Sequence, residues 1–239
     1  MDNPILTIDE REAINSGRWF GSLSPSLRHD ILRCAYVKRF RDGELIVARG
    51  EPPEDWIACA KGAVRVSSTS ISGKQVTLTY VEPGIWFGDV SIFDGDRRTH
   101  DAYAHGECTI LCVAKADFKK ILAAHVELYE AMLRLHARRI RQLFGLVEDL
   151  NTLPLRARLA KQLIHLVRSY GVPSLSNASE MRISLHLAQE ELAQLLGASR
   201  QRVNQELKSM ERDETLRIEP GGLIIRNRDA LMRIVESDQ

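Results

Sequence analysis

A close series of hydrogen-bonding side chains runs from residue 199 to residue 208. Guanidinium, ammonium and amide groups of these types can reach base edges and phosphates in the major groove of DNA. Val203, Leu207 and Met210 recur among them at helical spacing, which predicts that the polar side chains share the outer face of one helix. The alternative is an ordinary helical hairpin with a solvated polar face. The residues expected to contact DNA are Ser199, Arg200, Gln201, Arg202, Asn204, Gln205 and Lys208.

A first helix and a tight turn are expected just before this series. Gly197 can take the left-handed conformation that ends a helix, because it has no Cβ to clash. Ser199 can then cap the next helix by accepting hydrogen bonds from the amides of its first turn. Ala193, Gly197 and Val203 fall where a helix-turn-helix needs a small residue, a turn glycine and a buried β-branched residue. Because the cap, glycine, apolar stripe and polar face agree, the sequence favours recognition of double-stranded DNA.

Composition limits the other classes of function. The 239 residues suit two domains, and 33 basic against 32 acidic residues give a formal charge of +1. Attraction to phosphates would therefore come from a local stretch, residues 133–168, where eight Lys and Arg face only Glu148 and Asp149. No apolar run approaches the ~20 residues of a membrane span, and a signal-peptide core is not found. Four cysteines without metal-ligand or disulfide spacing indicate a reducing, cytoplasmic location and no bound metal.

The first half of the chain is expected to form a β-rich domain, placed at residues 24–125. Residues 1–23 are mixed in character and predict a peripheral N-terminal segment. Ser24-Pro25 then opens a short helix that extends to about Ala35. From residue 37 to residue 113, short apolar runs alternate with glycine turns, which argues for a compact antiparallel sandwich or barrel. The turn dipeptides are Asp42-Gly43, Lys61-Gly62, Ser72-Gly73, Pro83-Gly84 and Asp94-Gly95.

A long dimerisation helix is predicted next, within residues 126–152. No proline interrupts it before residue 150, and its apolar stripe with flanking arginines suits a parallel contact between two copies. Helix-turn-helix proteins usually read DNA as two-fold dimers, which favours this interpretation. The alternative is a helix packed on the sheet of its own subunit. The residues expected at the dimer interface are Met132, Leu135, Ile140, Leu143, Leu146 and Leu150.

Leu153-Pro154 ends this helix and begins the C-terminal domain, residues 153–239. A hairpin after the helix-turn-helix is expected to form the wing of a winged helix. The fold class is therefore α+β: an antiparallel β-roll, a long dimerisation helix and a C-terminal winged helix-turn-helix. Besides the two reading helices, the elements expected in this domain are a helix at 155–170, a strand at 181–185, hairpin strands at 215–219 and 223–226, and a helix at 230–235.

This arrangement resembles the cyclic-AMP receptor / fumarate-nitrate regulator (Crp–Fnr) family of bacterial transcription factors over residues 20–228. The most specific piece is Leu196–Asn204, which reads Leu-Gly-Ala-Ser-Arg-Gln-Arg-Val-Asn. The second piece, Gly84–Asp94 followed by Arg97-Arg98-Thr99, is similar to the family's phosphate-binding cassette. The resemblance implies a jelly roll like that of cyclic-nucleotide-binding domains. It also implies a homodimer whose partners are an inverted-repeat operator and RNA polymerase.

The cassette of nucleotide-binding relatives holds the cyclic phosphate with helix amides and an Arg-Ser/Thr pair, an arrangement that suits an anion. Three departures leave the effector's identity open. The acid that takes the ribose hydroxyl is usually Glu but is Asp89 here, and the segment between Phe93 and Arg98 is one residue shorter. The Thr-Ser pair that contacts adenine is replaced by Leu143-Phe144, which cannot donate hydrogen bonds to a base. The expected effector-binding residues are Gly88, Asp89, Val90, Arg98, Thr99, Leu143 and Phe144.

The sequence thus predicts a transcription regulator controlled by a small effector, with a cyclic nucleotide as the first candidate class, and not an enzyme. An alternative within the family is an effector-independent regulator with a vestigial cassette. A more distant alternative is a cyclic-nucleotide-binding module that regulates an attached enzyme or channel, which the helix-turn-helix argues against. An enzyme is disfavoured because no P-loop, nucleophile elbow or paired metal-ligand motif is found. The resemblance implies an iron–sulfur cluster only in the family's redox branch, which carries an N-terminal cysteine cluster. No cysteine precedes Cys34 here, so such a cluster is not expected.

Overall fold

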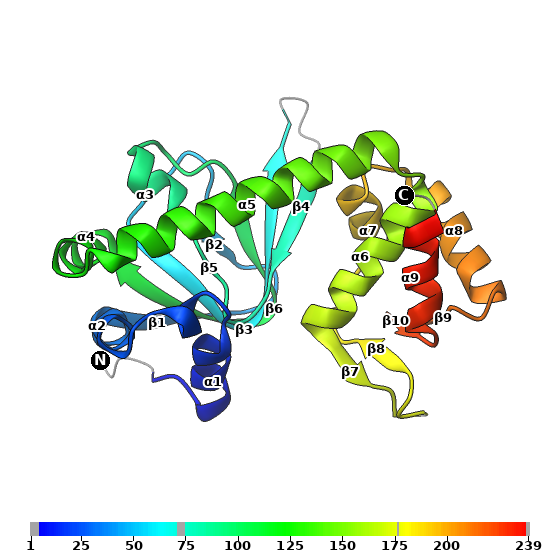
Figure 1. Cartoon of the computed structure of the whole chain (residues 1–239), viewed down its shortest axis with the longest axis horizontal. Coiled ribbons are helices and arrows are strands. Elements are labelled where there is room, and N and C mark those ends of the chain that lie inside the picture. Colours follow the sequence, from blue (N-terminus) through cyan, green and yellow to red (C-terminus); the bar gives the residue numbers. More distant parts are fainter. Residues whose placement is uncertain (1–4, 71–74, 176, 238–239) are drawn as a thin grey trace. The chain divides into compact units, whose positions relative to one another are not determined.

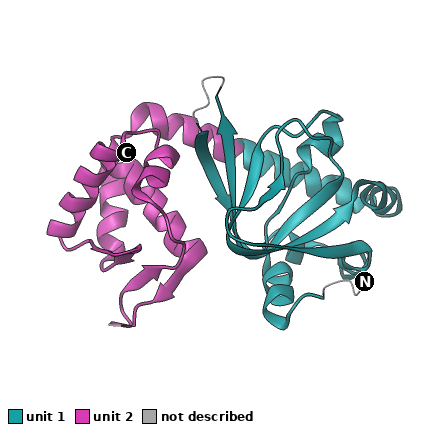
Figure 2. Ribbon diagram, turned by 180° about the vertical axis from the view of Figure 1, so that it is seen from behind, with its two compact units in different colours: residues 1–140 teal, residues 141–239 magenta. Residues whose placement is uncertain are grey.

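The apolar runs and glycine turns between residues 37 and 113 form antiparallel strands in the computed structural model of the chain (Figure 1). The structure describes residues 5–70, 75–175 and 177–237. The chain divides into two units, residues 1–140 and residues 141–239 (Figure 2). Antiparallel sheets and helices occur in both units, so the predicted α+β class is confirmed.

The first unit is built on a six-stranded antiparallel sheet with the strand order β1-β6-β3-β4. β2 pairs with β6, and β5 pairs with β3, so these two long strands organise the sheet. The strands are β1 Ala35–Phe40, β2 Leu45–Val47, β3 Asp55–Thr69, β4 Gln75–Val81, β5 Trp86–Phe87 and β6 Asp101–Ala114. The helices of this unit are α1 Ile8–Ser16, the 3-10 turn η1 Phe20–Ser22, α2 Pro25–Cys34, α3 Val90–Asp94 and α4 Lys115–Ala124.

Lys61-Gly62 is not the turn that the sequence predicts, because β3 continues through it as one strand. The register between β3 and β6 shifts on both sides of Lys61, as it does in a β-bulge. Gly62 has φ +82°, and a Cβ at this position would lie 2.5 Å from the carbonyl oxygen of Glu107. The glycine therefore bends one long strand rather than ending a short one. The predicted turn Ser72-Gly73 lies outside the described residues.

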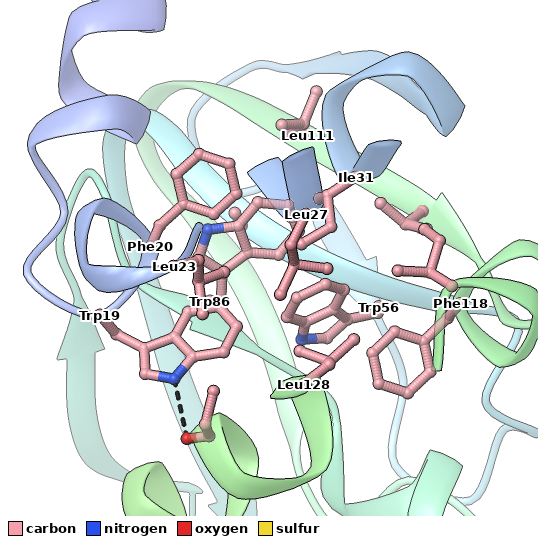
Figure 3. Close-up of a cluster of buried hydrophobic side chains, with 14 of the residues drawn as sticks. Trp19, Phe20, Leu23, Leu27, Ile31, Trp56, Trp86, Leu111, Phe118 and Leu128 are labelled. Carbon is pink, nitrogen blue, oxygen red and sulfur yellow. Dashed lines mark hydrogen bonds between the residues drawn. The ribbon is translucent and has the colours of Figure 1, made fainter. Parts of the chain in front are cut away.

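The prediction of a peripheral N-terminal segment is wrong, since residues 14–23 enter the main core of the first unit (Figure 3). Ile14 and Phe20 are fully buried. The Trp19 ring stands edge-on to Trp56 with 5.6 Å between centroids, and its Nε1 donates to the carbonyl oxygen of Ala131, 3.0 Å away. Large aromatic rings bury much apolar area, which explains why residues 14–23 pack in the core rather than on the surface.

A buried carboxylate fastens α1 to the sheet. The Glu10 side chain is 3% exposed and accepts hydrogen bonds from Arg39 Nη1 at 2.7 Å and from the Thr109 hydroxyl at 2.7 Å. Burial alone would raise the pKa of Glu10, but the hydrogen bonds from Arg39, Thr109 and the Thr7 amide lower it to about 2. Glu10 is therefore ionised at neutral pH and links α1 to β1 and β6.

We expect Glu10→Gln to lower the free energy of unfolding by about 1–3 kcal/mol at neutral pH, because the charge-assisted bonds to the half-exposed Arg39 are lost. The folded-state pKa lies below the ordinary value of 4.5, so this stabilisation is present above pH 4.5 and is lost as the pH falls towards 2. Urea unfolding of both proteins across this range measures the effect. A difference that stays constant down to the lowest pH would contradict it.

The second unit carries the predicted winged helix-turn-helix. α6, Leu155–Tyr170, has the predicted bounds, and the small antiparallel sheet has the order β7-β8-β10-β9. Within the described residues, no helix combines the length and the apolar character needed to span a membrane. The long helix α5, Glu127–Thr152, begins in the first unit and ends in the second. The remaining elements are β7 Gly171–Pro173, β8 Met181–Ile183, α7 Gln189–Leu195, α8 Arg200–Arg212, β9 Leu216–Glu219, β10 Gly222–Ile225 and α9 Arg228–Ser237.

Candidate DNA interface and effector site

The helix-turn-helix forms from α7 and α8, as the sequence predicts (Figure 1). Gly197 has φ +59°, the left-handed conformation expected of the turn glycine. The Ser199 hydroxyl accepts from the amide of Arg202 at 3.4 Å and caps α8. Ala193 and Val203 are buried at 1% and 0% exposure, so the two helices meet through the predicted small and β-branched residues.

The side chains expected to read DNA lie at the surface of α8 and its cap. Asn204 is the exception, since it is half-buried and its Oδ1 lies 3.4 Å from the Nε2 donor of Gln189 on α7. Val203, Leu207 and Met210 are buried, and the face of α8 that carries Gln201, Gln205 and Lys208 is exposed. The exposed members of the set are Ser199, Arg200, Gln201, Arg202, Gln205 and Lys208. Their contacts with DNA stay a prediction.

Two arginines of α6 brace the helix-turn-helix, and sequence reasoning did not single them out. Arg158 Nη1 donates to the carbonyl oxygen of Leu196 at the end of α7, 2.8 Å away. Arg156 Nη1 donates to the Ser209 hydroxyl at 3.0 Å, and its Nη2 lies 2.6 Å from Asp213 at the end of α8. Both arginines belong to the basic stretch 133–168. The number of charges in that stretch does not distinguish arginines that stabilise the fold from arginines that are free to contact phosphates.

The cassette brings Gly88 and Arg98 together. Arg98 is 6% exposed, and its Nη1 and Nη2 donate to the carbonyl oxygens of Gly88 at 2.8 Å and Asp55 at 2.5 Å. Gly88 has φ +79°, a conformation that strains any residue with a side chain, and a Cβ there would lie 2.4 Å from Arg98 Nη1, so a larger residue would have to displace the guanidinium. Among the described residues, no carboxylate lies within ion-pair distance of Arg98. Burial lowers the pKa of this guanidinium, and the negative charges of Asp55, Asp89 and Glu51 offset only part of that shift.

The carboxylate of Asp89 already has two side-chain partners within the protein. Its carboxylate is fully buried, and Arg139 Nη1 lies 2.8 Å from Oδ2 and 3.0 Å from Oδ1. His136 Nε2 lies 3.2 Å from Oδ2, and Arg139 Nη2 also donates to the Trp86 carbonyl oxygen at 2.5 Å. These two residues of α5 were not predicted at the site. They lie about 50 positions from Asp89, and only the fold brings them there.

The other predicted effector residues are accessible. Val90 is 48% exposed at the start of α3, and Thr99 is exposed with its hydroxyl 2.8 Å from His100 Nδ1. Leu143 and Phe144 are 61% and 70% exposed on α5. Gly88, Asp89 and Arg98 therefore have a defined geometry in the first unit, and Leu143 and Phe144 are exposed residues of the second unit.

The structure corrects the face of α5 that can meet a second copy. Met132 is 2% exposed and packs in the core of the first unit, and Leu135 packs against the same core. Leu133, beside them, is 70% exposed. The first turns of α5 lie on their own sheet, so their apolar stripe is already covered. The exposed apolar residues that follow a heptad pattern on α5, with successive spacings of seven, three, four and three, are defined here as the seam: Leu133, Ile140, Leu143, Val147 and Leu150.

Leu146, also predicted at the interface, is 48% exposed and neighbours the seam. Heptad spacing could have identified Leu133 and Val147, because both fit the three–four alternation with Ile140 and Leu143. The sequence could not show that Met132 is buried in the core of its own unit, because that depends on which face of α5 meets the sheet.

Comparison with known proteins covers both parts of the chain. Residues 37–125 match the cyclic nucleotide-binding domain, and residues 157–234 match the Crp-like helix-turn-helix domain. The CRP-like cAMP-activated global transcriptional regulator of Mycobacterium tuberculosis is 31% identical over 90% of this chain and 94% of its own length. The global nitrogen regulator of Synechococcus elongatus is 27% identical over 82% of this chain and 87% of its own. The structure of FixK2 from Bradyrhizobium japonicum has the same fold, with a TM-score of 0.73 and 21% identity over 84% of this chain and 96% of that one. Both domains are thus shared with transcriptional regulators, and the chain belongs to the Crp family of transcription regulators.

Proposed function

We propose that this regulator acts as a homodimer that reads an inverted-repeat operator through α8, under the control of a small anionic effector held by Arg98. RNA polymerase is the partner through which such binding would alter transcription, and the bacterial cytoplasm is where it would meet its operators. A cyclic nucleotide is the first candidate class of effector. The relative from Mycobacterium tuberculosis is named as cAMP-activated, which supports this class.

The buried Arg98 is the observation that carries the effector proposal. A guanidinium has five N–H donors, and carbonyl oxygens of Gly88 and Asp55 account for two of them. A buried cation without an ionic partner is costly, and an anion that binds there offsets this cost. A phosphate matches the planar fork of the remaining donors. The geometry therefore favours an anionic ligand over a neutral one.

Leu143 and Phe144 on α5 limit which groups of the effector, other than its anion, they could contact. Leu143 and Phe144 are exposed and cannot donate hydrogen bonds, so recognition of an adenine by polar contacts at these positions is not expected. They can instead pack against a ring or an aliphatic group. Cyclic AMP is consequently one candidate among several cyclic nucleotides and is not singled out.

Thermal denaturation of the purified protein with cyclic AMP, cyclic GMP, cyclic di-GMP and haem tests the proposal. A ligand at a hundredfold excess over its Kd should add about 2.7 kcal/mol to the stability of the folded state. We expect one of the three cyclic nucleotides to raise the melting temperature and to tighten operator binding. Stabilisation by haem alone, or operator binding that no cyclic nucleotide changes, would contradict the effector proposal.

An effector-independent regulator is the second candidate. The observation that favours it is Asp89, whose carboxylate is already occupied by Arg139 and His136. In such a regulator the cassette would be a structural remnant, and the purified protein would bind its operator tightly with nothing added. The denaturation experiment separates the two candidates, because only the first predicts a ligand-dependent shift.

Arg200 is expected to hydrogen-bond the O6 and N7 atoms of a guanine. It is exposed and directly follows the Ser199 cap, where side chains of a recognition helix enter the groove. Arg200→Ala should weaken operator binding by about 1–3 kcal/mol and relax the preference at one base of each half-site. Binding assays on the operator, on variants at that base and on random DNA measure this. Equal weakening on all sequences would show that Arg200 contacts only phosphate.

Gln201 should read the next position differently from a glutamate, the residue found there in many relatives that the sequence resembles. Glutamine can pair with adenine through N6 and N7, whereas glutamate can only accept a hydrogen bond. The half-site is therefore expected to differ from the usual one at its second position.

A further inference from the structure

His136 lies at a position of the seam pattern on α5 and also contacts Asp89 of the cassette. Along α5, the seam residues follow a heptad pattern, and the position between Leu133 and Ile140 that continues its alternating spacings of three and four is 136. Leu133 and Ile140 are both large, apolar and exposed, at 70% and 52%. His136 is thus the polar residue in an otherwise apolar row.

The imidazole of His136 does not simply face solvent. Its Nε2 lies 3.2 Å from Oδ2 of the fully buried Asp89, and its side chain is 30% exposed. Its ring is nearly perpendicular to that of Phe93 on α3, at 86° with 6.0 Å between centroids. Arg139, one turn further along α5, holds both oxygens of the same carboxylate. The cassette therefore fixes the position of this ring from two directions.

We propose that His136 is a positioning residue that couples the cassette to the dimer seam. The inference rests on the proposed effector site, because Asp89 is the group that both would share. With His136 drawn to Asp89, the seam lacks an apolar side chain at position 136. An effector hydroxyl that donates to Oδ2 takes the place of His136, and Arg139 continues to neutralise the carboxylate. The released ring can then turn towards the second copy of α5, so that the filled cassette strengthens the seam.

The hydrogen-bonding capacity of Asp89 supports this competition. Each carboxylate oxygen accepts about two hydrogen bonds, and Oδ2 already faces both Arg139 and His136. A further donor at Oδ2 must displace one of them. His136 is the weaker partner, because its contact is longer than that of Arg139 and it is charged only when protonated.

The coupling is measured as the ratio of operator Kd without and with a saturating concentration of whichever of cyclic AMP, cyclic GMP and cyclic di-GMP raises the melting temperature of the wild type most. For the wild type we expect a ratio within the range of allosteric coupling, about 5–150. His136→Leu completes the apolar row permanently, so it should tighten ligand-free operator binding and bring the ratio to within about threefold of one. The same variant should lower the dimer dissociation constant of the ligand-free protein about tenfold or more. His136→Gln keeps a donor towards Asp89 and should retain most of the wild-type ratio.

Arg134→Leu is the matched control, since it places a leucine on the exposed surface of α5 outside the seam and the cassette contacts. An equal fall of the ratio in Arg134→Leu, or a wild-type ratio that persists in His136→Leu, overturns the inference alone. A wild-type ratio of one without a thermal shift for any cyclic nucleotide overturns the proposed effector function, and the inference with it.

Discussion

Replacing Ile140 with glutamate is expected to dissociate the dimer and to abolish specific operator binding. Ile140 lies in the middle of the seam and is 52% exposed in the single chain. In a two-fold dimer the two copies of this residue lie close together, so the variant would bury two like charges in an apolar contact. The cost should reach about 3 kcal/mol or more, which is over a hundredfold in the dimer dissociation constant.

Analytical ultracentrifugation and operator titration measure both effects. Gln142→Glu is the matched control, because it adds the same side chain at an exposed position of α5 outside the seam. We expect the control to remain dimeric. An Ile140→Glu protein that stays dimeric and binds its operator normally would refute the seam, and the second copy would have to bind through another surface.

Removing the Arg98 guanidinium is expected to eliminate the response to the effector. Arg98 is the buried cation without an ionic partner in the described cassette, and it should supply two charge-assisted hydrogen bonds to a bound phosphate. Arg98→Ala should therefore weaken effector binding by about 3 kcal/mol, roughly a hundredfold. Isothermal titration with the cyclic nucleotide that stabilises the wild type measures the loss.

Arg97→Ala controls for a general change in charge. Arg97 is the exposed neighbour, and its Nη1 donates to the carbonyl oxygen of Gly50. This variant should keep most of the affinity. Equal losses in both variants would indicate nonspecific attraction to a basic surface, and unchanged affinity in Arg98→Ala would assign the ligand to a different site.

Local patterns were sufficient for elements whose determinants lie close together in the sequence. The turn at Gly197, the Ser199 cap and the bounds of α6 follow from residues within a few positions of each other. Gly88 and Arg98 were assigned to one effector site through a family resemblance rather than through any periodic pattern, and they are hydrogen-bonded in the structure. Their role in binding an effector stays a prediction.

Contacts between distant segments could not be predicted in this way. The ion pair of Asp89 with Arg139 and the placement of Met132 in the core both depend on how α5 lies on the sheet. The burial of Trp19 and Phe20 depends on a core that closes around them only in three dimensions (Figure 3). The bulge at Gly62 was read as a turn because a glycine after a polar residue is typical of both.

Selection of operators from a random double-stranded DNA library tests the account most directly, because it asks whether a dimer reads DNA through α8. The selected sites should be inverted repeats with half-site centres about 10–10.5 base pairs apart, or roughly 34–36 Å. Selection with Arg200→Ala should lose one guanine in each half. A single unpaired half-site, or a consensus that Arg200→Ala leaves unchanged, would contradict the account.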